Sequence, residues 1–336
     1  FLYAYFSAKL SYTVLLLLLF GIQSYDLLQV GFRFVPESGF TRQNPYDSVF
    51  MERQARPLDR FIQQNIYDEA GIYEHRVLPL LDNPFNNAVP SYFYPTIGGY
   101  SGAKLSLFQD VFMSNNSALF DGPFGINLDL LRLFNTKYIT YGGNLNVPGV
   151  VPVYSSEQGS VYEVQDILPK AFFVDSVRLV NSGPEAFDYL KNPGRIDFSS
   201  VALVELDDLW EDQAIETINS LPTSTLVDST SLVNVTKYTG AELELNIERF
   251  STGFLVINEL YYPAGWKAYL NGEEIQIYKT NYFLRGLIIP PGNHKLILDF
   301  QPDSFGQGIL VSWLSIAFQL ILGLWVGITW FRTKES

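Results

Sequence analysis

A long apolar run near the C-terminus limits what this chain can fold into more than any other feature does. Residues 308–331 carry no charged side chain, and these 24 residues exceed the roughly 20 that an α-helix needs to cross a bilayer. Tryptophans lie near both ends of the run, as in the aromatic belts of membrane proteins: Trp313, Trp325 and Trp330. Arg332 and Lys334 follow directly, and the positive-inside rule assigns such residues to the cytoplasm. We therefore expect a transmembrane helix over residues 308–331 and a cytoplasmic tail over residues 332–336.

A second, weaker apolar run lies near the N-terminus. We expect a transmembrane helix at about residues 12–30, although polar residues, Asp26 among them, interrupt its second half. Asp26 would lie at the outer interface of the membrane or face the interior of a helix bundle. Lys9 would lie in a short cytoplasmic turn, and residues 1–8 would end an earlier helix. Because the chain opens within an apolar stretch, we expect it to be part of a longer, multi-pass protein with residues 31–307 outside the cytoplasm.

The composition argues against several kinds of protein. Only 17% of the residues are charged, against about 25% in an average soluble domain, which agrees with a membrane protein. The net charge of −13 argues against a nucleic-acid partner, because a phosphate backbone requires a basic surface. The chain has no cysteine, so disulfides and thiolate metal sites are excluded, and its two histidines, His75 and His294, cannot form a multi-histidine metal site.

No cofactor and no metal site is identified in the sequence. A divalent cation remains an open alternative at a group of acids near one expected helix start: Glu205, Asp207, Asp208, Glu211 and Asp212. Acids at such a place are also favoured by the helix dipole alone, which needs no ligand.

The region between the two expected spans divides by its residue pattern. Residues 31–150 mix helical and strand signals, so we expect an external α+β domain there. Residues 151–307 are dominated by short strands, so we expect an external antiparallel β-sandwich or jelly-roll-like domain. The expected helices are residues 47–65, 103–112, 128–134, 185–191 and 209–218. The expected strands outside the hairpins are residues 75–80, 137–141, 242–248 and 254–260.

Two turn sequences predict β-hairpins in the second domain. Asn271-Gly272 is the strongest short hairpin signal, and the Pro-Pro-Gly-Asn stretch at residues 290–293 also favours a turn. The strand pairs that these turns would join are residues 266–270 with 275–278, and residues 284–289 with 295–300.

A glycine-rich stretch offers one candidate for ligand contact. Residues 98–104 precede an expected helix, and backbone N–H groups at such a place can receive an anion such as a lipid phosphate. A tight turn that feeds a helix would give the same pattern. Together with two residues at a strand start, the candidate substrate contacts are His75, Arg76, Tyr100, Ser101 and Lys104.

Clustered aromatic residues offer a second candidate. Tyr261, Tyr262 and Trp266 surround Pro263-Ala264-Gly265. Exposed aromatic rings beside a β-module suit stacking against carbohydrate, whereas buried rings would simply form core.

The same aromatic segment carries a resemblance to a known family. Gly253–Ala268 is similar to the tyrosine, proline, glycine, tryptophan and lysine signature of the bacterial YfhO-like membrane proteins. Further stretches fit the same family in the same order: residues 91–109, 131–140, 168–172, 271–272, 290–294 and 301–302. There are departures, because Ala264 is inserted before Gly265, Lys170 stands where arginine is commoner, and Asn271 stands where aspartate is commoner. Ser101 replaces a frequent histidine, which argues against proton transfer by that loop.

The resemblance implies a polytopic protein of the GT-C glycosyltransferase superfamily. Such proteins move a sugar from a lipid-phosphate carrier onto an envelope polymer, such as a teichoic acid or lipopolysaccharide, outside the bacterial cytoplasmic membrane. The catalytic acid of that superfamily lies in the first external loop, so it would lie upstream of this chain, and no catalytic residue is expected here. The implied partners are membrane lipid, a lipid-linked sugar donor and an envelope polymer acceptor.

Two other functions remain open from the sequence. The chain could be a non-catalytic, membrane-anchored carbohydrate-binding or assembly module. A transporter subunit fits less well, because the expected spans contain no paired charges beyond Asp26.

Overall fold

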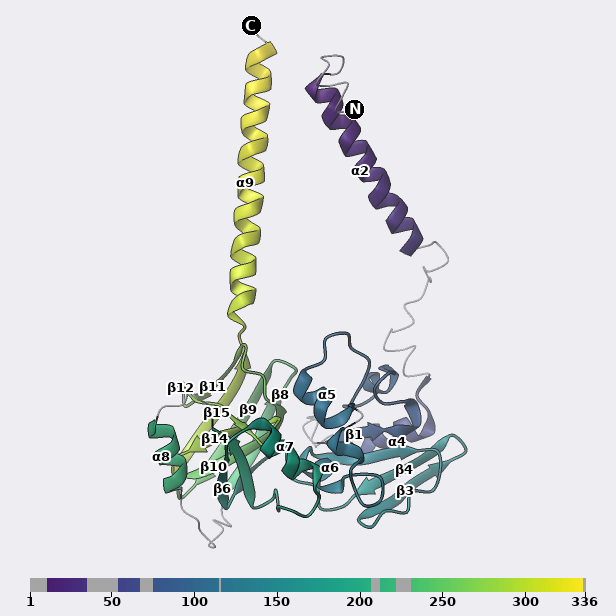
Figure 1. Ribbon diagram of the computed structural model, residues 1–336, viewed down its shortest axis with the longest axis vertical. Coiled ribbons are helices and arrows are strands. Elements are labelled where there is room, and N and C mark those ends of the chain that lie inside the picture. The colour runs from purple at the N-terminus through teal and green to yellow at the C-terminus, as the bar shows by residue number, and fades with distance from the viewer. Residues whose placement is uncertain are drawn as a thin grey trace. The chain divides into compact units, whose positions relative to one another are not determined.

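The computed structural model describes residues 11–34, 54–66, 75–114, 116–206, 212–221 and 231–334 (Figure 1). The chain divides into two compact units, residues 1–55 and 56–336, and each is described by itself. In the first unit, helix α2 spans Tyr12–Phe34. Its segment Tyr12–Gly31 is long and apolar enough to cross a membrane, and only 6% of its most apolar window is buried.

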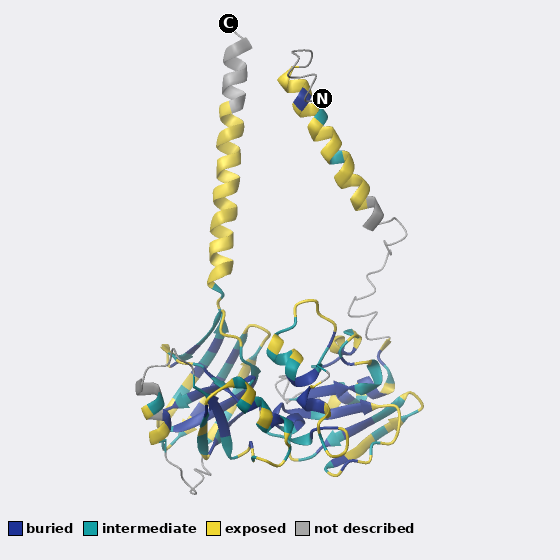
Figure 2. Cartoon of the chain, viewed as in Figure 1, coloured by how far each residue is buried: buried dark blue, intermediate teal, exposed yellow. Residues whose placement is uncertain are grey.

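The last helix of the chain, in the second unit, has the same character. Helix α9 spans Asp303–Lys334, and none of the apolar window within Asp303–Trp325 is buried (Figure 2). A helix that is apolar on all sides is stable only where lipid or protein covers it. Both expected terminal helices are therefore present, and both are candidate membrane spans by length and composition.

A four-stranded sheet begins the globular part of the second unit. Its strands are β1 (Arg76–Pro79), β2 (Thr136–Tyr141), β3 (Val150–Ser156) and β4 (Gly159–Val164). Their order is β1-β2-β4-β3, with β1 and β2 parallel and the other pairs antiparallel. The helices around this sheet are α4 (Pro57–Ile66), η2 (Leu80–Asp82), η3 (Val89–Tyr92), α5 (Ser106–Phe112), η4 (Ala118–Phe120) and α6 (Leu128–Leu133).

A six-stranded mixed sheet follows. Its strands are β5 (Ala171–Val174), β6 (Ser176–Val180), β7 (Val201–Glu205), β10 (Gly253–Leu260), β13 (Tyr278–Thr280) and β14 (Leu284–Ile289). Their order is β5-β10-β14-β13-β7-β6, and only β6 and β7 are parallel. The parallel pair is connected through α7 (Gly183–Lys191), which Ser182 caps by accepting the Glu185 N–H.

A five-stranded antiparallel sheet completes the unit. Its strands are β8 (Leu232–Tyr238), β9 (Glu242–Arg249), β11 (Trp266–Leu270), β12 (Glu273–Ile275) and β15 (Gly292–Phe300), in the order β12-β11-β15-β9-β8. Helix α8 (Asp212–Ser220) lies between β7 and β8 in the sequence. The antiparallel strands are confirmed, whereas the sandwich or jelly-roll topology stays a prediction.

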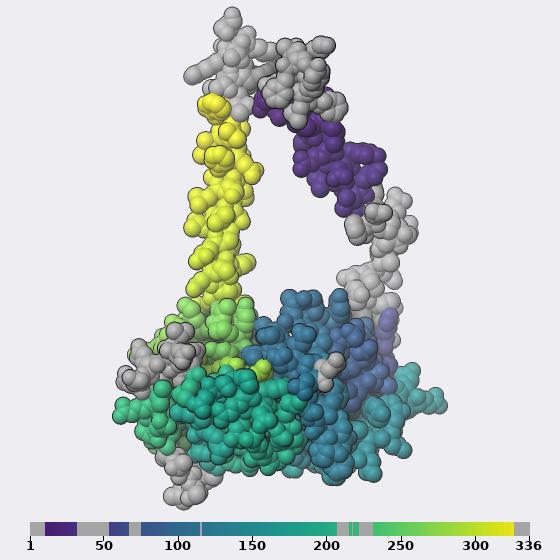
Figure 3. Space-filling model, viewed as in Figure 1, coloured from purple at the N-terminus to yellow at the C-terminus, as the bar shows by residue number. Residues whose placement is uncertain are grey.

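Strand β10 packs on both of its faces and so connects the hydrophobic clusters of the sheets. Successive side chains of a strand point to opposite faces of its sheet. Phe254 and Val256 join a hydrophobic cluster that also contains residues of the four-stranded sheet, whereas Leu255 and Ile257 join a cluster with the five-stranded sheet. In the space-filling view, the blue atoms of the earlier residues border the teal atoms of the residues that follow (Figure 3).

The predicted hairpin across residues 290–293 is wrong. Strand β14 pairs with β10 and β13 in the six-stranded sheet, whereas β15 pairs with β9 and β11 in the five-stranded sheet. The turn therefore carries the chain from one sheet to the other, and Gly292 adopts a φ of 133° that favours glycine. The first hairpin, across Asn271-Gly272, is present, but its second strand is Glu273–Ile275 rather than residues 275–278, and Tyr278 belongs to β13 of the six-stranded sheet.

Other boundaries differ by a few residues. Proline was expected to kink or split the helix over residues 47–65, and α4 indeed begins at Pro57, because proline is favoured at the first helical position. Residues 47–53 of the expected first helix lie outside the described residues. The boundary expected near residue 150 stays a prediction, although β3 and β4 hydrogen-bond into the same sheet as β2.

Candidate functional site

The segment between β10 and β11 lines a cavity of about 210 Å³. Tyr261, Tyr262 and Trp266 contribute aromatic rings, and Arg285 of β14 contributes a guanidinium. We call this cavity the aromatic pocket. Its remaining lining residues come from the same loop and from β11 to the segment after β12: Pro263, Lys267, Ala268, Glu274, Ile275, Gln276 and Ile277.

The three aromatic residues predicted from the sequence do meet in one place. The Trp266 ring lies 5.4 Å from the Phe300 ring, and the Arg285 guanidinium carbon lies 3.8 Å from the centre of the Trp266 ring. Trp266 is half-buried and also packs against the core between the sheets, while Tyr262 remains 37% exposed. Trp266 therefore contributes to the core, whereas carbohydrate stacking by these three residues stays a prediction, and Tyr262 is more exposed than Trp266.

The loop of the aromatic pocket contacts the segment that leads into α9. Gly265 has a φ of 104°, and its carbonyl accepts the Gln301 N–H at 2.6 Å. A Cβ atom on Gly265 would lie 2.9 Å from the Pro302 Cα, so only glycine allows this approach. The pocket is thus tied to the chain directly before the candidate membrane span.

A buried group of charges lies next to Arg285, and it joins different sheets. Glu259 of β10 binds the Arg76 Nη2 atom at 2.7 Å and the Lys170 Nζ atom at 2.9 Å, both through its Oε1 atom. The Lys170 ammonium also lies 3.6 Å from the centre of the Tyr238 ring. We call Glu259, Arg76, Lys170, Arg285 and Tyr238 the Glu259 cluster. Because Arg76 belongs to β1, the cluster links the four-stranded sheet to the six-stranded sheet.

Burial and charge shift the pKa values of the Glu259 cluster. Burial by itself raises the pKa of Glu259, but Arg76 and Lys170 outweigh it and hold the pKa at about 2. Burial lowers the pKa of Lys170 to about 8 and that of Arg285 to about 10. Near neutral pH, three cations therefore surround a single carboxylate, which leaves an excess of positive charge beside the aromatic pocket.

The other predicted contacts do not join this pocket among the described residues. Tyr100 is 71% exposed and Ser101 is exposed, whereas the Lys104 ammonium donates to the Phe85 carbonyl at 2.9 Å. The Gly99 N–H donates to the Pro84 carbonyl, so this N–H of the glycine-rich stretch is already bound. A role of this loop in binding substrate stays a prediction.

His75 and Arg76 lie at the start of β1, where the protein itself engages their side chains. The His75 Nδ1 atom lies 3.3 Å from the Asn135 Oδ1 atom, and Arg76 binds Glu259 and the Phe134 carbonyl. Burial, followed by the charge of Lys137, lowers the pKa of His75 to about 4, so His75 is neutral near pH 7. The predicted anion contact at these two residues is likewise untested.

The acidic candidates for a cation lie largely outside the described residues. Asp207, Asp208 and Glu211 are not described, and Glu205 forms an ion pair with Lys279 at 2.8 Å. Within the described part of the chain, no group of three histidine, aspartate or glutamate side chains could hold a metal ion.

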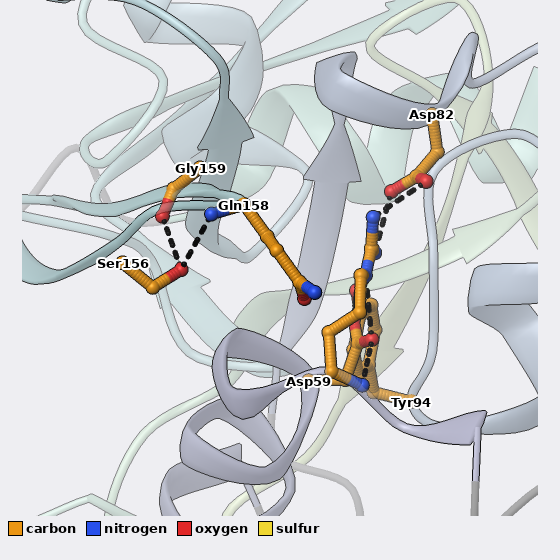
Figure 4. A network of polar contacts seen from close by, with 7 residues as sticks. Asp59, Asp82, Tyr94, Ser156, Gln158 and Gly159 are labelled. Atoms are coloured by element: carbon orange, nitrogen blue, oxygen red, sulfur yellow. Dashed lines mark hydrogen bonds and ion pairs between the residues drawn. The ribbon is translucent and has the colours of Figure 1, made fainter.

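A second buried charge network has a structural role. The Arg56 guanidinium binds Asp59 and Asp82, and the Tyr94 hydroxyl donates to Asp59 at 2.8 Å (Figure 4). The Arg56 backbone N–H donates to the Asp59 carboxylate, which satisfies a free donor at the start of α4. Asp59 is fully buried, and its oxygens bind groups of the protein, so this network holds α4 in place.

A larger cavity of about 510 Å³ lies near α6 and the loop before β7. Its polar residues largely bind one another or the backbone. Asp129 accepts the Gly194 N–H, Arg132 contacts Asp129 and Asp166, and Asp197 accepts from two serine hydroxyls. The polar groups of this cavity thus already take part in hydrogen bonds and ion pairs within the protein.

Sequence reasoning missed Glu259 and Arg285 as members of a site. Each is a lone charge in an otherwise apolar strand, and such a charge is stable only with a partner. That pattern was visible in the sequence, but the partners come from β1, from the segment before β5 and from the start of β11. Their approach depends on the pairing of the sheets.

Comparison with known proteins agrees with the resemblance. Residues 191–312 match the family described as bacterial membrane protein YfhO. The matched stretch contains the loop of the aromatic pocket, Glu259 and Arg285, and it ends within α9. Comparisons with curated proteins and with solved structures found no significant match. The family match over residues 191–312 and the two candidate spans together support a YfhO-like bacterial membrane protein.

Proposed function

We propose that the chain is the C-terminal part of a polytopic membrane glycosyltransferase of the GT-C superfamily, and that its external region binds a saccharide in the aromatic pocket. The observation that carries the proposal is the meeting of Tyr261, Tyr262, Trp266 and Arg285 around one cavity in the family-matched segment. The transfer step itself is assigned to residues upstream of this chain.

The lining of the aromatic pocket suits a sugar ring. A sugar presents C–H groups on its faces and hydroxyl groups at its edge, so it needs an aromatic surface beside hydrogen-bonding groups. Tyr262 supplies the exposed ring, and Lys267, Glu274 and Gln276 supply polar groups in the lining. The volume of about 210 Å³ falls below the ~300–1,000 Å³ of pockets for drug-sized ligands, which favours a single sugar unit.

The attachment of the pocket to α9 supports a membrane-linked substrate. The Gly265 carbonyl binds the Gln301 N–H, only two residues before α9 begins at Asp303. A sugar bound here would lie near the end of a candidate span, where the head group of a lipid-linked donor resides. On this proposal, residues 31–307 lie outside the bacterial cytoplasmic membrane, and the acceptor is an envelope polymer.

A second candidate function is a non-catalytic carbohydrate-binding or assembly module. Among the described residues that line the aromatic pocket, Glu274 is the only carboxylate. Acid–base chemistry on a glycosidic bond uses a pair of carboxyl groups, so the pocket by itself favours binding over reaction. Both candidates require saccharide binding, and they differ in whether the protein transfers a sugar.

Saccharide binding can be tested with the full chain in detergent. We expect Tyr262→Ala to weaken binding of a glucose-containing oligosaccharide about tenfold, measured by isothermal titration calorimetry, because it removes the exposed ring. Phe124→Ala is the matched control, since Phe124 is also an exposed ring but does not line the pocket. Equal affinity of both variants and the wild type would contradict the proposal.

A transfer assay then separates the two functions. Membranes that contain the full-length protein are supplied with a radiolabelled lipid-linked sugar and a polymer acceptor. For a transferase, Tyr262→Ala should raise the KM for the sugar substrate while the protein still supports transfer. If the wild-type membranes bind saccharide but show no transfer above membranes that lack the protein, the module is favoured.

The same assay tests the glycine-rich loop. If Lys104 neutralises a substrate phosphate, Lys104→Ala should lower transfer strongly, with Lys237→Ala as the control at an exposed lysine. Unchanged transfer in Lys104→Ala would mean that the bond from Lys104 to the Phe85 carbonyl is purely structural.

A further inference from the structure

Arg285 is buried, and its terminal Nη1 atom has no hydrogen-bond partner among the described residues. The residue is only 3% exposed, its Nε atom donates to the Leu260 carbonyl at 2.9 Å, and its guanidinium carbon lies over the Trp266 ring. The Nη1 atom is enclosed by protein, and in the described part of the chain no oxygen or nitrogen atom accepts a hydrogen bond from it. Buried donors of this kind are normally satisfied, because an unsatisfied charged donor is costly.

The nearby carboxylate is already bound by other cations. Glu259 Oε1 accepts from both Arg76 and Lys170, and Arg285 forms no ion pair with any described residue. The two remaining charged residues of the aromatic pocket, Lys267 and Glu274, offset each other in formal charge. The pocket therefore borders an uncompensated positive charge.

Other arginines of the chain have hydrogen-bond partners for their terminal nitrogens. Arg249 also stacks on an aromatic ring, with its guanidinium carbon 4.0 Å from the centre of the Phe173 ring. Its Nε atom likewise donates to a backbone carbonyl, but its Nη1 atom reaches the Ser231 hydroxyl. Arg56 binds two carboxylates. Arg285 differs from both because it lines a cavity and its Nη1 atom has no partner in the described part of the chain.

We infer that the aromatic pocket binds a saccharide that carries a negative group, a phosphate or a carboxylate, and that Arg285 binds this group. The inference rests on the proposed saccharide binding and adds the charge of the ligand. A water molecule in the pocket would accept hydrogen bonds from the N–H donors but would leave the positive charge uncompensated. An anion would accept the same hydrogen bonds and also neutralise the charge. Guanidinium groups match phosphate and carboxylate oxygens in geometry, and this one lies over the Trp266 ring.

The test compares four small probes on the full chain in detergent by calorimetry: glucose, glucose 1-phosphate, glucuronate and glucosamine. We expect the wild type to bind at least one anionic sugar about tenfold or more tightly than glucose, and glucosamine more weakly than glucose. The phosphate and carboxylate probes distinguish the two sources of negative charge. Inorganic phosphate alone reports whether the anion binds without the sugar.

Three variants locate the charge preference. Arg285→Gln should lose the preference for anionic sugars, and Arg285→Lys should keep part of it. Arg249→Gln is the matched control, because it alters a stacked arginine outside the pocket, and it should keep the full preference. Thermal unfolding shows whether Arg285→Gln folds. If it does not fold, the relative affinities of the four probes for the wild type and for Arg285→Lys still test whether Arg285 binds the negative group.

The outcomes separate this inference from the proposed function. Equal binding of glucose and both anionic sugars, abolished by Tyr262→Ala, would overturn the inference and leave saccharide binding intact. Binding of inorganic phosphate that depends on Arg285, without binding of any sugar, would overturn saccharide binding and leave only an anion site. An anionic preference that survives in Arg285→Gln would overturn the assignment of Arg285.

Discussion

Glu259 lies near the end of β10, where cations from two other segments bind the same oxygen atom. Arg76 comes from the first strand of the unit, and Lys170 comes from the segment before β5. A buried ion pair has a large desolvation cost, so its presence contributes more to a specific arrangement than to net stability. Removing only the carboxylate should strongly destabilise the protein, because it leaves buried cations that repel one another.

We predict that Glu259→Gln destabilises the protein by about 3–5 kcal/mol, the usual effect of leaving a buried charge unpaired. Thermal unfolding in detergent, followed by circular dichroism, measures the change. Glu242→Gln is the control, since Glu242 pairs with the exposed Lys237 on the surface of β9, and it should produce a much smaller shift. A shift of the same size in both variants would argue against an essential Glu259 cluster.

Acid should destabilise the protein in two steps. His75 has a pKa lowered from 6.5 to about 4, and Glu259 has a pKa lowered from 4.5 to about 2. In both cases the unfolded chain binds the proton more readily, so stability is lost as pH falls, first from 6.5 to 4 and then from 4.5 to 2.

His75→Gln should remove the first of these steps. We expect its unfolding temperature to fall less than that of the wild type between pH 7 and pH 4.5, measured by circular dichroism. An identical fall in the two proteins would show that His75 does not titrate in this way.

At the scale of elements, turn sequences predicted where strands end better than they predicted which strands pair. Asn271-Gly272 joins two strands that do form a hairpin, whereas residues 290–293 join strands of different sheets. Both pairs of strands have suitable β-forming residues, so local signals cannot distinguish a hairpin from a crossing. Which strands pair with β14 and β15 depends on the packing of the two hydrophobic clusters on either side of β10.

The turn at Gly265 allows a sharper prediction. Gly265 and Gly272 both have positive φ values, 104° and 92°, but only at Gly265 would a Cβ atom crowd another segment, near Pro302. We expect Gly272→Ala to cost about 1 kcal/mol from backbone strain and Gly265→Ala to cost clearly more. Gly265→Ala should also weaken saccharide binding, because the loop of the aromatic pocket must move.

Unfolding temperature and saccharide affinity, measured on both variants, test this prediction. Equal effects of the two substitutions would mean that the contact between Gly265 and the segment before α9 contributes little to stability or to saccharide binding.

At the scale of the whole molecule, the chain without cysteine allows a direct test of its topology. A single cysteine introduced at Gln158, which is exposed in the β3–β4 turn, should react with a membrane-impermeant maleimide in intact cells. A cysteine in place of Thr333, beyond the apolar run of α9, should react only after the membrane is permeabilised. The reverse pattern, or reaction of both in intact cells, would contradict an external globular region with a cytoplasmic tail.

The sequence by itself determined the features that depend on composition and local pattern. The terminal helices follow from long apolar runs, most strands follow from alternation and β-forming residues, and Tyr261, Tyr262 and Trp266 stand out because they adjoin one another in the sequence. Only the tertiary structure decided which strands share a sheet and which charges meet. Arg285 reaches Trp266, and Glu259 reaches Arg76 across 183 positions of the chain, because burial on both faces of β10 fixes the pairing of distant strands.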